Sequence, residues 1–219
     1  MIRMAPSILA ADFAALGADI DDVAPGADWL HVDVMDGHFV PNLTIGPPVV
    51  EAIRKRTDLH LDCHLMMTDP GRYLEAFRSA GADSCTVHVE IGGTGELIAR
   101  MRELGLGVGL AVNPETGFEA VEPWLDRLDI LLVMSVHPGF GGQRFMPEVV
   151  PKVQRAAGLA AERGLDLVIE VDGGIDTSTA GTMAAAGARV LVAGSAIFGA
   201  ADRVAAAQAI RTAAEAAAG

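Results

Sequence analysis

LHVDVMDG, residues 30–37, is the stretch of this chain that decides the fold. Side chains of a β-strand alternate between its two faces, so the leucine and valines of this stretch share one face while His31 and Asp33 share the other. LHLDCHLM (residues 59–66) and LVIEVDGG (residues 167–174) repeat this pairing of an apolar face with a polar face. The sequence therefore predicts three buried strands that direct histidines and carboxylates into a shared interior.

Short apolar runs with strand character alternate with helical patterns along the whole chain. The expected strands lie near residues 4–9, 28–35, 59–66, 83–89, 107–112, 129–135, 166–171 and 189–193. The expected helices lie at residues 12–23, 48–56, 70–79, 95–104, 118–125, 147–163, 177–186 and 200–218. Eight such repeats predict an α/β fold, a single eight-stranded parallel (β/α)8 TIM barrel over residues 1–219. A doubly wound open sheet is the alternative, but no Gly-x-Gly-x-x-Gly motif follows the first expected strand.

The composition bounds the partners and the compartment. The chain has 219 residues, of which 51% are hydrophobic, enough for one large core, and its formal net charge is −13. Such an acidic chain repels nucleic acid and anionic membranes, so we expect neither as a partner. No apolar run reaches the roughly 20 residues that span a bilayer, and the first residues carry no signal-peptide segment. With Cys63 and Cys85 expected as small buried side chains, these features favour a cytoplasmic protein.

The carboxyl ends of the expected strands carry residues of the types that bind metal ions. Active sites of eight-stranded α/β barrels lie at these ends. Four candidate ligands from the second, third and seventh strands are found there: His31, Asp33, His64 and Asp172. Two imidazole nitrogens and two carboxylate oxygens suit one divalent ion such as Zn²⁺, Mn²⁺, Fe²⁺ or Co²⁺. The alternative is four scattered polar residues that are satisfied separately. His88 also points inward in this pattern, but nothing requires it as a ligand.

Three glycine-rich segments at the same ends are typical of phosphate-binding loops. They are PGFGGQ (138–143), DGG (172–174) and AGS (193–195). Glycines let backbone N–H groups approach an anion closely, and barrels often bind phosphate after the seventh and eighth strands. Each glycine pair alone would also fit a tight turn. Both lysines, Lys55 and Lys152, fall in expected helices far from the strand ends, so a Schiff-base aldolase is disfavoured.

Taken together, these motifs resemble the ribulose-phosphate 3-epimerase family of the pentose phosphate and Calvin pathways. The resemblance covers nearly the whole chain and rests on APSILAADF (5–13), HVDVMDGHFVPN (31–42), DCHLM (62–66), VHPGFGGQ (136–143), VDGGI (171–175) and AGSAIF (193–198). It implies an isomerase that interconverts D-ribulose 5-phosphate and D-xylulose 5-phosphate. It also implies one divalent metal ion in each subunit, bound by His31, Asp33, His64 and Asp172.

The family's roles carry over to the matching positions. Asp33 and Asp172 match two carboxylates that move a proton at C3 on opposite faces of the substrate, so one should be protonated when the other is not. The resemblance assigns substrate contacts to Ser7, Met35, His64, Met66, Met134, Gly139, Phe140, Gly141, Gly142, Gly173, Gly174, Gly194 and Ser195. His137 departs from the family, which often has Asn or Glu there. Its parity with Ser135 points it away from the interior, so we interpret it as part of a loop and not as a fifth ligand.

Other functions remain open at this point. A 3-epimerase of a six-carbon ketose phosphate, such as D-allulose 6-phosphate, would keep the same ligands, although GFGG (139–142) favours the pentulose enzyme. A decarboxylase of the orotidine- or ketogulonate-phosphate type is disfavoured, because that group has Asp-x-Lys-x-x-Asp at the third strand, whereas this chain has His64 in the lysine position of Asp62-Cys63-His64. A non-catalytic metal- or phosphate-binding barrel would not need two facing carboxylates. We expect a small sugar phosphate as the ligand and a homo-oligomer as the assembly.

Overall fold

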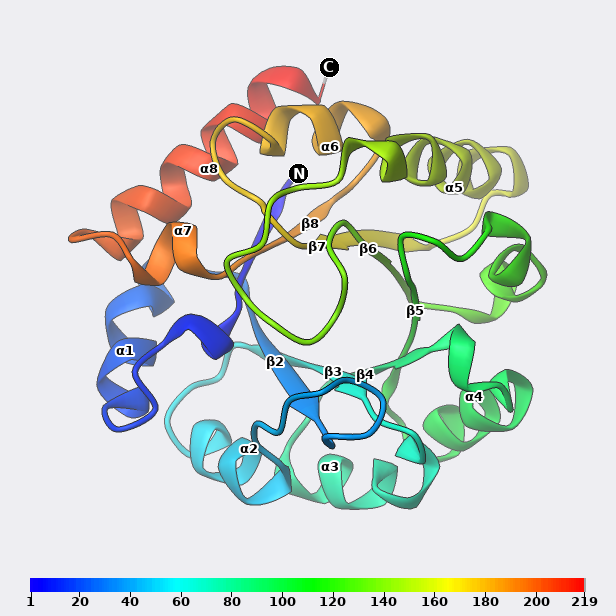
Figure 1. The fold of residues 1–219 in the computed structure, drawn as a ribbon, viewed down its shortest axis with the longest axis horizontal. Coiled ribbons are helices and arrows are strands. Elements are labelled where there is room, and N and C mark those ends of the chain that lie inside the picture. The colour runs from blue at the N-terminus through cyan, green and yellow to red at the C-terminus, as the bar shows by residue number, and fades with distance from the viewer. Residues whose placement is uncertain (219) are drawn as a thin grey trace.

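Eight parallel strands form a nearly closed barrel in the computed structural model, which describes residues 1–218 (Figure 1). The strands are β1 (Arg3–Pro6), β2 (Trp29–Met35), β3 (His60–Met66), β4 (Ser84–His88), β5 (Gly107–Val112), β6 (Ile130–Met134), β7 (Val168–Asp172) and β8 (Val190–Ala193). Their order in the sheet is β1-β8-β7-β6-β5-β4-β3-β2, so each strand lies beside the next one in the chain. This order confirms the (β/α)8 barrel and excludes the doubly wound sheet.

The joint between β1 and β2 closes the barrel. Among residues 1–218 its β-bridge is a single parallel one between Ser7 and His31, and the Asp28 N–H donates to the Met4 carbonyl at 2.9 Å, whereas the other neighbouring strands pair over several residues. The first strand is shorter than expected because Ser7 turns the chain into the 3-10 helix η1 (Ile8–Ala10). Its hydroxyl accepts the Leu9 N–H at 3.4 Å. Ser7 therefore lies at the joint, directly after β1.

Helices surround the barrel on its outside (Figure 1). The α-helices are α1 (Leu16–Val23), α2 (Pro47–Arg54), α3 (Leu74–Ala80), α4 (Thr94–Glu103), α5 (Val150–Arg163), α6 (Ala180–Ala186), α7 (Ser195–Phe198) and α8 (Arg203–Ala217). The remaining 3-10 helices are η2 (Ala24–Gly26), η3 (Pro70–Arg72), η4 (Val89–Ile91), η5 (Phe118–Ala120), η6 (Glu122–Arg127) and η7 (Pro147–Val149). Several expected helices begin later than predicted because their first residues form turns or 3-10 helices.

The prediction of an α-helix at residues 118–125 was wrong. The chain there forms two 3-10 helices, η5 and η6, with Pro123 near the start of the second. Proline has no N–H to donate, and in a continuous α-helix its ring would clash with the carbonyl of residue 119. The proline therefore divides the segment.

The two faces of the strands differ in chemistry, as the alternation predicts. Leu30 and Val32 face outward and belong to the apolar layer between sheet and helices. Cys63 and Cys85 are free thiols in the same layer and lie opposite each other in the register of β3 and β4. The interior face carries buried histidines and carboxylates in place of some of the branched apolar side chains that usually fill such barrels.

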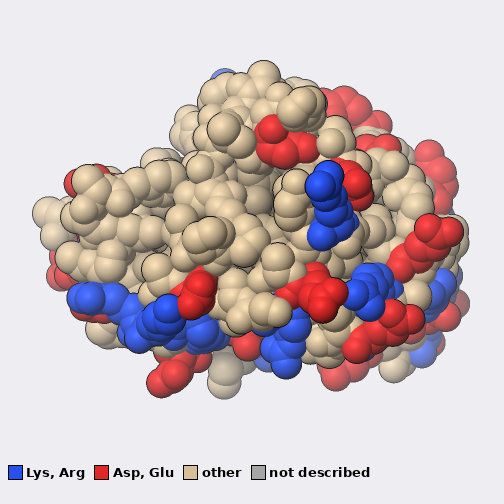
Figure 2. Space-filling model, turned by 90° about the horizontal axis from the view of Figure 1, so that it is seen from below, with Lys and Arg blue, Asp and Glu red and all other residues tan. Residues whose placement is uncertain are grey.

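The surface carries charges of both signs. Figure 2 shows Lys and Arg interspersed with Asp and Glu, mostly along one side of the face that it presents. Exposed ion pairs such as Arg100–Glu75 and Arg102–Asp129 link α4 to its neighbours. Exposed pairs of this kind typically contribute about 0–1 kcal/mol to stability. Within residues 1–218, every helix is too short or too polar to cross a membrane.

Candidate active site

The four predicted metal ligands converge at the carboxyl ends of β2, β3 and β7. One ligand atom from each of them lies within 4.8 Å of the others: His31, Asp33, His64 and Asp172. Asp33 Oδ1 lies 3.4 Å from His31 Nε2 and 3.2 Å from His64 Nδ1. Asp172 Oδ2 lies 4.0 Å from His31 Nε2. The residues are therefore one cluster and not four separate polar groups.

The register of the strands explains this convergence. Asp33 on β2 lies opposite His64 on β3, and both side chains share the interior face. His31 lies two residues before Asp33 and so faces the same way. Asp172 ends β7, on the other side of the barrel interior. Strand geometry alone thus brings the four side chains together.

The cluster fits a divalent metal ion. His31 is fully buried, and its Nε2 has no hydrogen-bond partner although it points between two carboxylates. An unpartnered buried ring nitrogen beside two carboxylates is a donor set that a cation would satisfy. Two nitrogens and two oxygens suit a transition metal better than Mg²⁺ or Ca²⁺, which prefer oxygen ligands. The cluster could therefore bind one divalent ion.

Asp33 and Asp172 have pKa values shifted in opposite directions. Burial raises the pKa of Asp33, but the positive charge of His31 above all outweighs burial and holds this pKa well below its usual range. Burial also raises the pKa of Asp172, and the negative charge of Asp33 adds to the effect, so this pKa is about 7. One carboxyl is therefore ionised while the other can carry a proton, which suits a base and an acid.

A second layer of carboxylates lies behind His31. Its Nδ1 lies 2.9 Å from Asp62 Oδ2 and 3.4 Å from Glu170 Oε1. Burial raises the pKa of Glu170, and the charge of Asp62 adds to it, giving a value of about 8. Burial lowers the pKa of His31, but Asp33, Asp62 and Glu170 together outweigh it and hold that pKa well above its usual range. The alternation placed Asp62 and Glu170 on the interior face, but sequence reasoning gave them no role.

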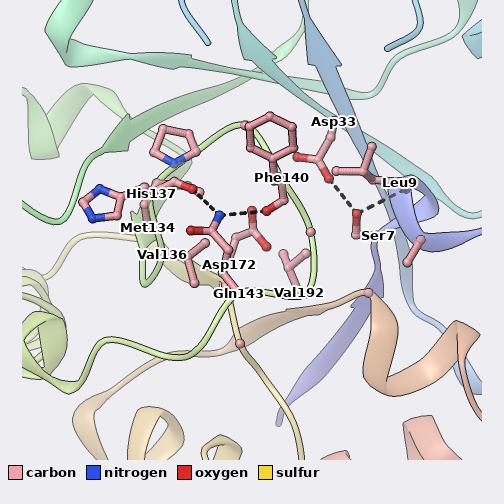
Figure 3. A pocket seen from close by; sticks show the side chains of 18 of the residues that line it. Ser7, Leu9, Asp33, Met134, Val136, His137, Phe140, Gln143, Asp172 and Val192 are labelled. Carbon is pink, nitrogen blue, oxygen red and sulfur yellow. Dashed lines mark hydrogen bonds between the residues drawn. The ribbon is translucent and has the colours of Figure 1, made fainter. Parts of the chain in front are cut away.

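A pocket opens above the cluster (Figure 3). All but one of the predicted substrate contacts line it: Ser7, Met35, Met66, Met134, Gly139, Phe140, Gly141, Gly142, Gly173, Gly174, Gly194 and Ser195. His64 is the exception because it is fully buried behind the pocket wall. Pro138 and Gln143, from the predicted segment PGFGGQ (138–143), also line the pocket, whereas sequence reasoning missed the contributions of Leu9, Ala10, Val136, Ile175 and Val192. Most of these lie in loops or immediately after strands, where alternation gives no direction.

Side-chain amides shape the loop between β6 and η7. Gln143 Nε2 donates to the carbonyl oxygens of His137 at 2.6 Å and Phe140 at 2.8 Å, as the dashed lines of Figure 3 show. Asn42 Nδ2, from the loop after β2, donates to the Gly139 carbonyl at 2.9 Å. Phe140 itself is 55% exposed at the mouth of the pocket. These bonds fix the backbone of a loop that carries an exposed aromatic ring.

The turn after β7 requires glycine. Gly173 and Gly174 have φ angles of +125° and +62°. A Cβ at Gly173 would lie 2.6 Å from Val136 Cγ2, and one at Gly174 would lie 2.5 Å from the Phe145 backbone nitrogen. The turn therefore packs directly against the loop after β6 and brings two of the three predicted phosphate-binding segments together.

Two further sequence predictions have different outcomes. His137 lies outside the four-residue cluster: its side chain is 62% exposed and its Nδ1 lies 2.7 Å from Glu115 Oε1, although the residue also contributes to the pocket rim. The prediction that both lysines lie far from the strand ends was wrong for Lys152. Its long side chain extends from α5, and its Nζ donates to the Asn113 carbonyl at 2.7 Å, directly after β5. It does not line the pocket.

Comparison with known proteins agrees with this geometry. Residues 3–198 match the model of the ribulose-phosphate 3 epimerase family. The ribulose-phosphate 3-epimerase of Bacillus subtilis is 52% identical over 93% of this chain and 95% of its own length. That of Synechocystis is 51% identical over 91% of this chain and 88% of its own length. The structure of 3-hexulose-6-phosphate synthase from Salmonella typhimurium superposes with a TM-score of 0.73, covering 99% of this chain and 100% of that one. At 20% identity it shows a shared fold only. The chain therefore belongs to the ribulose-phosphate 3-epimerase family of enzymes.

Proposed function

We propose that this chain interconverts D-ribulose 5-phosphate and D-xylulose 5-phosphate by proton transfer at C3 between two carboxylates. The observation that carries the proposal is the pair Asp33 and Asp172, whose pKa values are shifted apart within one metal-type cluster. Inversion at C3 removes a proton from one face of the carbon and returns one to the other. Two carboxyls from different sides of the barrel suit this task, because one starts ionised and the other protonated.

The surrounding groups support the same roles. Ser7 Oγ donates to Asp33 Oδ2 at 2.6 Å, which stabilises the ionised base. Met35, Met66 and Met134 line the pocket and offer polarizable apolar contacts without a competing proton donor. His31 and His64, with the two carboxylates, would hold the divalent ion. When bound, that ion supplies a Lewis acid for the negative charge that develops on the sugar oxygens.

Backbone N–H groups bind the phosphate in this proposal. The pocket rim contains glycines of three loops and no lysine, and those predicted to donate are Gly141, Gly142, Gly174, Gly194 and Ser195. Arg144 lies in an adjoining hollow that shares Gly142 and Gly174 with the rim. Residues 1–219 act as one catalytic domain, and the enzyme works in the cytoplasm as a homo-oligomer. Free buried cysteines agree with a reducing compartment.

Isotope exchange at C3 tests the two-face mechanism. Each of the variants Asp33→Asn and Asp172→Asn should fail to epimerise but retain one face that exchanges its proton with solvent. In deuterated water, one variant should then label D-ribulose 5-phosphate faster and the other D-xylulose 5-phosphate. Metal content is measured in both variants, because either change also removes a ligand. With metal retained, equal labelling of both epimers in each variant would point to a single base.

A second experiment tests which ketose phosphate the chain turns over. Turnover of ribulose 5-phosphate by the wild type separates an enzyme from a non-catalytic binding barrel. A higher kcat/KM for a six-carbon ketose phosphate than for ribulose 5-phosphate would transfer the same mechanism to the longer substrate.

A further inference from the structure

The two ring nitrogens of His64 face different partners. Nδ1 lies 3.2 Å from Asp33 Oδ1, inside the cluster, and Nε2 lies 2.8 Å from His88 Nε2, outside it. A neutral imidazole has one N–H donor and one lone-pair acceptor. Two ring nitrogens 2.8 Å apart therefore need one proton between them. The side that carries this proton decides whether His64 presents a lone pair or an N–H to the cluster.

Glu90 decides the position of that proton. Its Oε2 lies 3.1 Å from His88 Nδ1, and its Oε1 accepts the Asn113 backbone N–H at 2.8 Å. Burial raises the pKa of Glu90, but hydrogen bonds from His88 and the Asn113 N–H, among others, outweigh burial and bring it to about 2. The carboxylate is thus ionised and can only accept hydrogen bonds.

The direction of the whole chain of hydrogen bonds follows. When His88 Nδ1 donates to Glu90, its Nε2 is left as the acceptor. Nε2 of His64 then donates to it, and the lone pair of His64 lies on Nδ1. The opposite direction, with His64 Nδ1 donating to Asp33, would leave a lone pair facing the Glu90 carboxylate. Asp33 depends less on that donor because it already accepts the Ser7 hydroxyl at 2.6 Å and lies 3.4 Å from His31 Nε2.

The second histidine of the cluster is set the opposite way. Nε2 of His31 points between Asp33 and Asp172, and its Nδ1 lies 2.9 Å from Asp62 Oδ2. A carboxylate thus stands behind each histidine, directly for His31 and through His88 for His64. The two rings consequently present different nitrogens to the same point.

We infer that His88 and Glu90 are positioning residues, which keep the proton of His64 on Nε2 and its lone pair on Nδ1, ready for a divalent cation. This inference rests on the metal site of the proposed function. The His88 side chain is fully buried and its ring packs against Phe39, with centroids 4.6 Å apart, so water does not replace its hydrogen bonds. Outer partners of metal-binding histidines typically change metal affinity by about 10- to 100-fold when they are removed.

A purely structural role for His88 is the competing explanation, since its ring also stacks on His64 at a centroid distance of 4.9 Å. Three variants distinguish the positioning role of His88 from a purely structural role. His88→Leu introduces an apolar side chain of related volume and removes the hydrogen-bond acceptor. His88→Gln retains an acceptor, because its amide oxygen can take the His64 N–H. Thr86→Val is the matched control: Thr86 lies on the same face of β4, is fully buried, and its hydroxyl has no hydrogen-bond partner.

The experiment reads tautomer and metal affinity directly. Long-range ¹H–¹⁵N spectra of metal-free protein with ¹⁵N-labelled histidine show which nitrogen of His64 carries the proton, and competition with a chromophoric chelator gives the Kd for Zn²⁺ and Co²⁺. We expect the wild type to carry the His64 proton on Nε2. His88→Leu should allow the proton to move to Nδ1, toward Asp33, and should weaken metal binding by about 10- to 100-fold. His88→Gln and Thr86→Val should stay within about threefold of the wild type because the acceptor remains.

Clear results would overturn the inference. A wild-type His64 protonated on Nδ1, or a His88→Leu variant that binds metal within about twofold of the wild type, would exclude the positioning role. If His88→Leu does not fold, Glu90→Ala removes the terminal acceptor, and unchanged metal affinity in that variant would have the same meaning. Failure of the proposed function is distinguishable: a wild type that binds metal with the expected tautomer but does not turn over ribulose 5-phosphate refutes the function and leaves this inference intact.

Discussion

Replacing Ser7 with alanine removes a hydroxyl that supports the ionised form of Asp33. The bond is 2.6 Å long, and both residues are buried. A hydrogen bond to a buried charged group contributes about 1.5–3 kcal/mol, and each 1.4 kcal/mol corresponds to about a factor of ten in rate. If Asp33 must be ionised to take the C3 proton, Ser7→Ala should lower kcat/KM for ribulose 5-phosphate by about 10- to 100-fold.

Ser84→Ala provides the matched control for this experiment. Ser84 Oγ donates to Asp62 Oδ1 at 2.7 Å, also within the barrel, but Asp62 is not one of the four cluster residues. Both variants should lose free energy of unfolding in urea, by about 1–3 kcal/mol each. Only Ser7→Ala should lose most of its kcat/KM, with metal content measured in each sample. Wild-type kcat/KM in a fully metal-loaded Ser7→Ala protein would refute the role given to this bond.

Other expected outcomes follow from single features of the site. His64→Ala should lose metal content and activity together, and a variant that keeps one tightly bound equivalent would remove His64 from the ligand set. Arg144→Ala should change KM by less than about threefold, because backbone N–H groups bind the phosphate in the proposal, and a larger rise would assign that role to the guanidinium. Gly174→Ala should reduce both thermal stability and activity, because φ is +62° and the new Cβ would lie 2.5 Å from the backbone nitrogen of Phe145; an unchanged Tm would contradict this. Burial raises the pKa of Asp36, but three backbone N–H donors outweigh burial and hold this pKa at about 2, below its value in the unfolded chain. The ionised Asp36 therefore stabilises the fold above about pH 4, and this contribution is lost as the pH falls toward 2. Urea unfolding of Asp36→Asn should show a weaker dependence on pH in that window, and an identical dependence would refute the assignment.

Strand alternation was enough to predict the four-residue cluster. His31, Asp33 and His64 face inward because of their parity on two strands, and parallel strands in a barrel place their carboxyl ends in one layer. The same rule gives no direction beyond a strand end. Leu9 therefore escaped prediction as part of the pocket wall, because it lies in a 3-10 helix whose course depends on the bond from its N–H to Ser7.

Longer-range details were not available from the pattern. Which nitrogen of a histidine faces the cluster depends on its partner on another strand, as with His64 and His88. Glu90 escaped notice because it lies beyond the end of β4, in η4, where alternation stops. The reach of Lys152 toward Asn113 likewise depends on where the start of α5 lies relative to the loop after β5. By contrast, Pro123 was visible in the sequence, and its effect on a helix could have been predicted.

The joint between β1 and β2 is also the place where the reaction is proposed to occur. Ser7 and His31 form the bridge that completes the ring, and both contact Asp33. Ser7 is held from its other side by the carbonyl of Ala193, near the far end of the chain, which accepts its N–H at 3.0 Å. We therefore expect a chain that is still being synthesised to be inactive until β8 has been made and has paired with β1. Turnover would then indicate that the barrel has closed. A mutation that weakens the joint between β1 and β2 would abolish activity while most of the helices and strands remain folded.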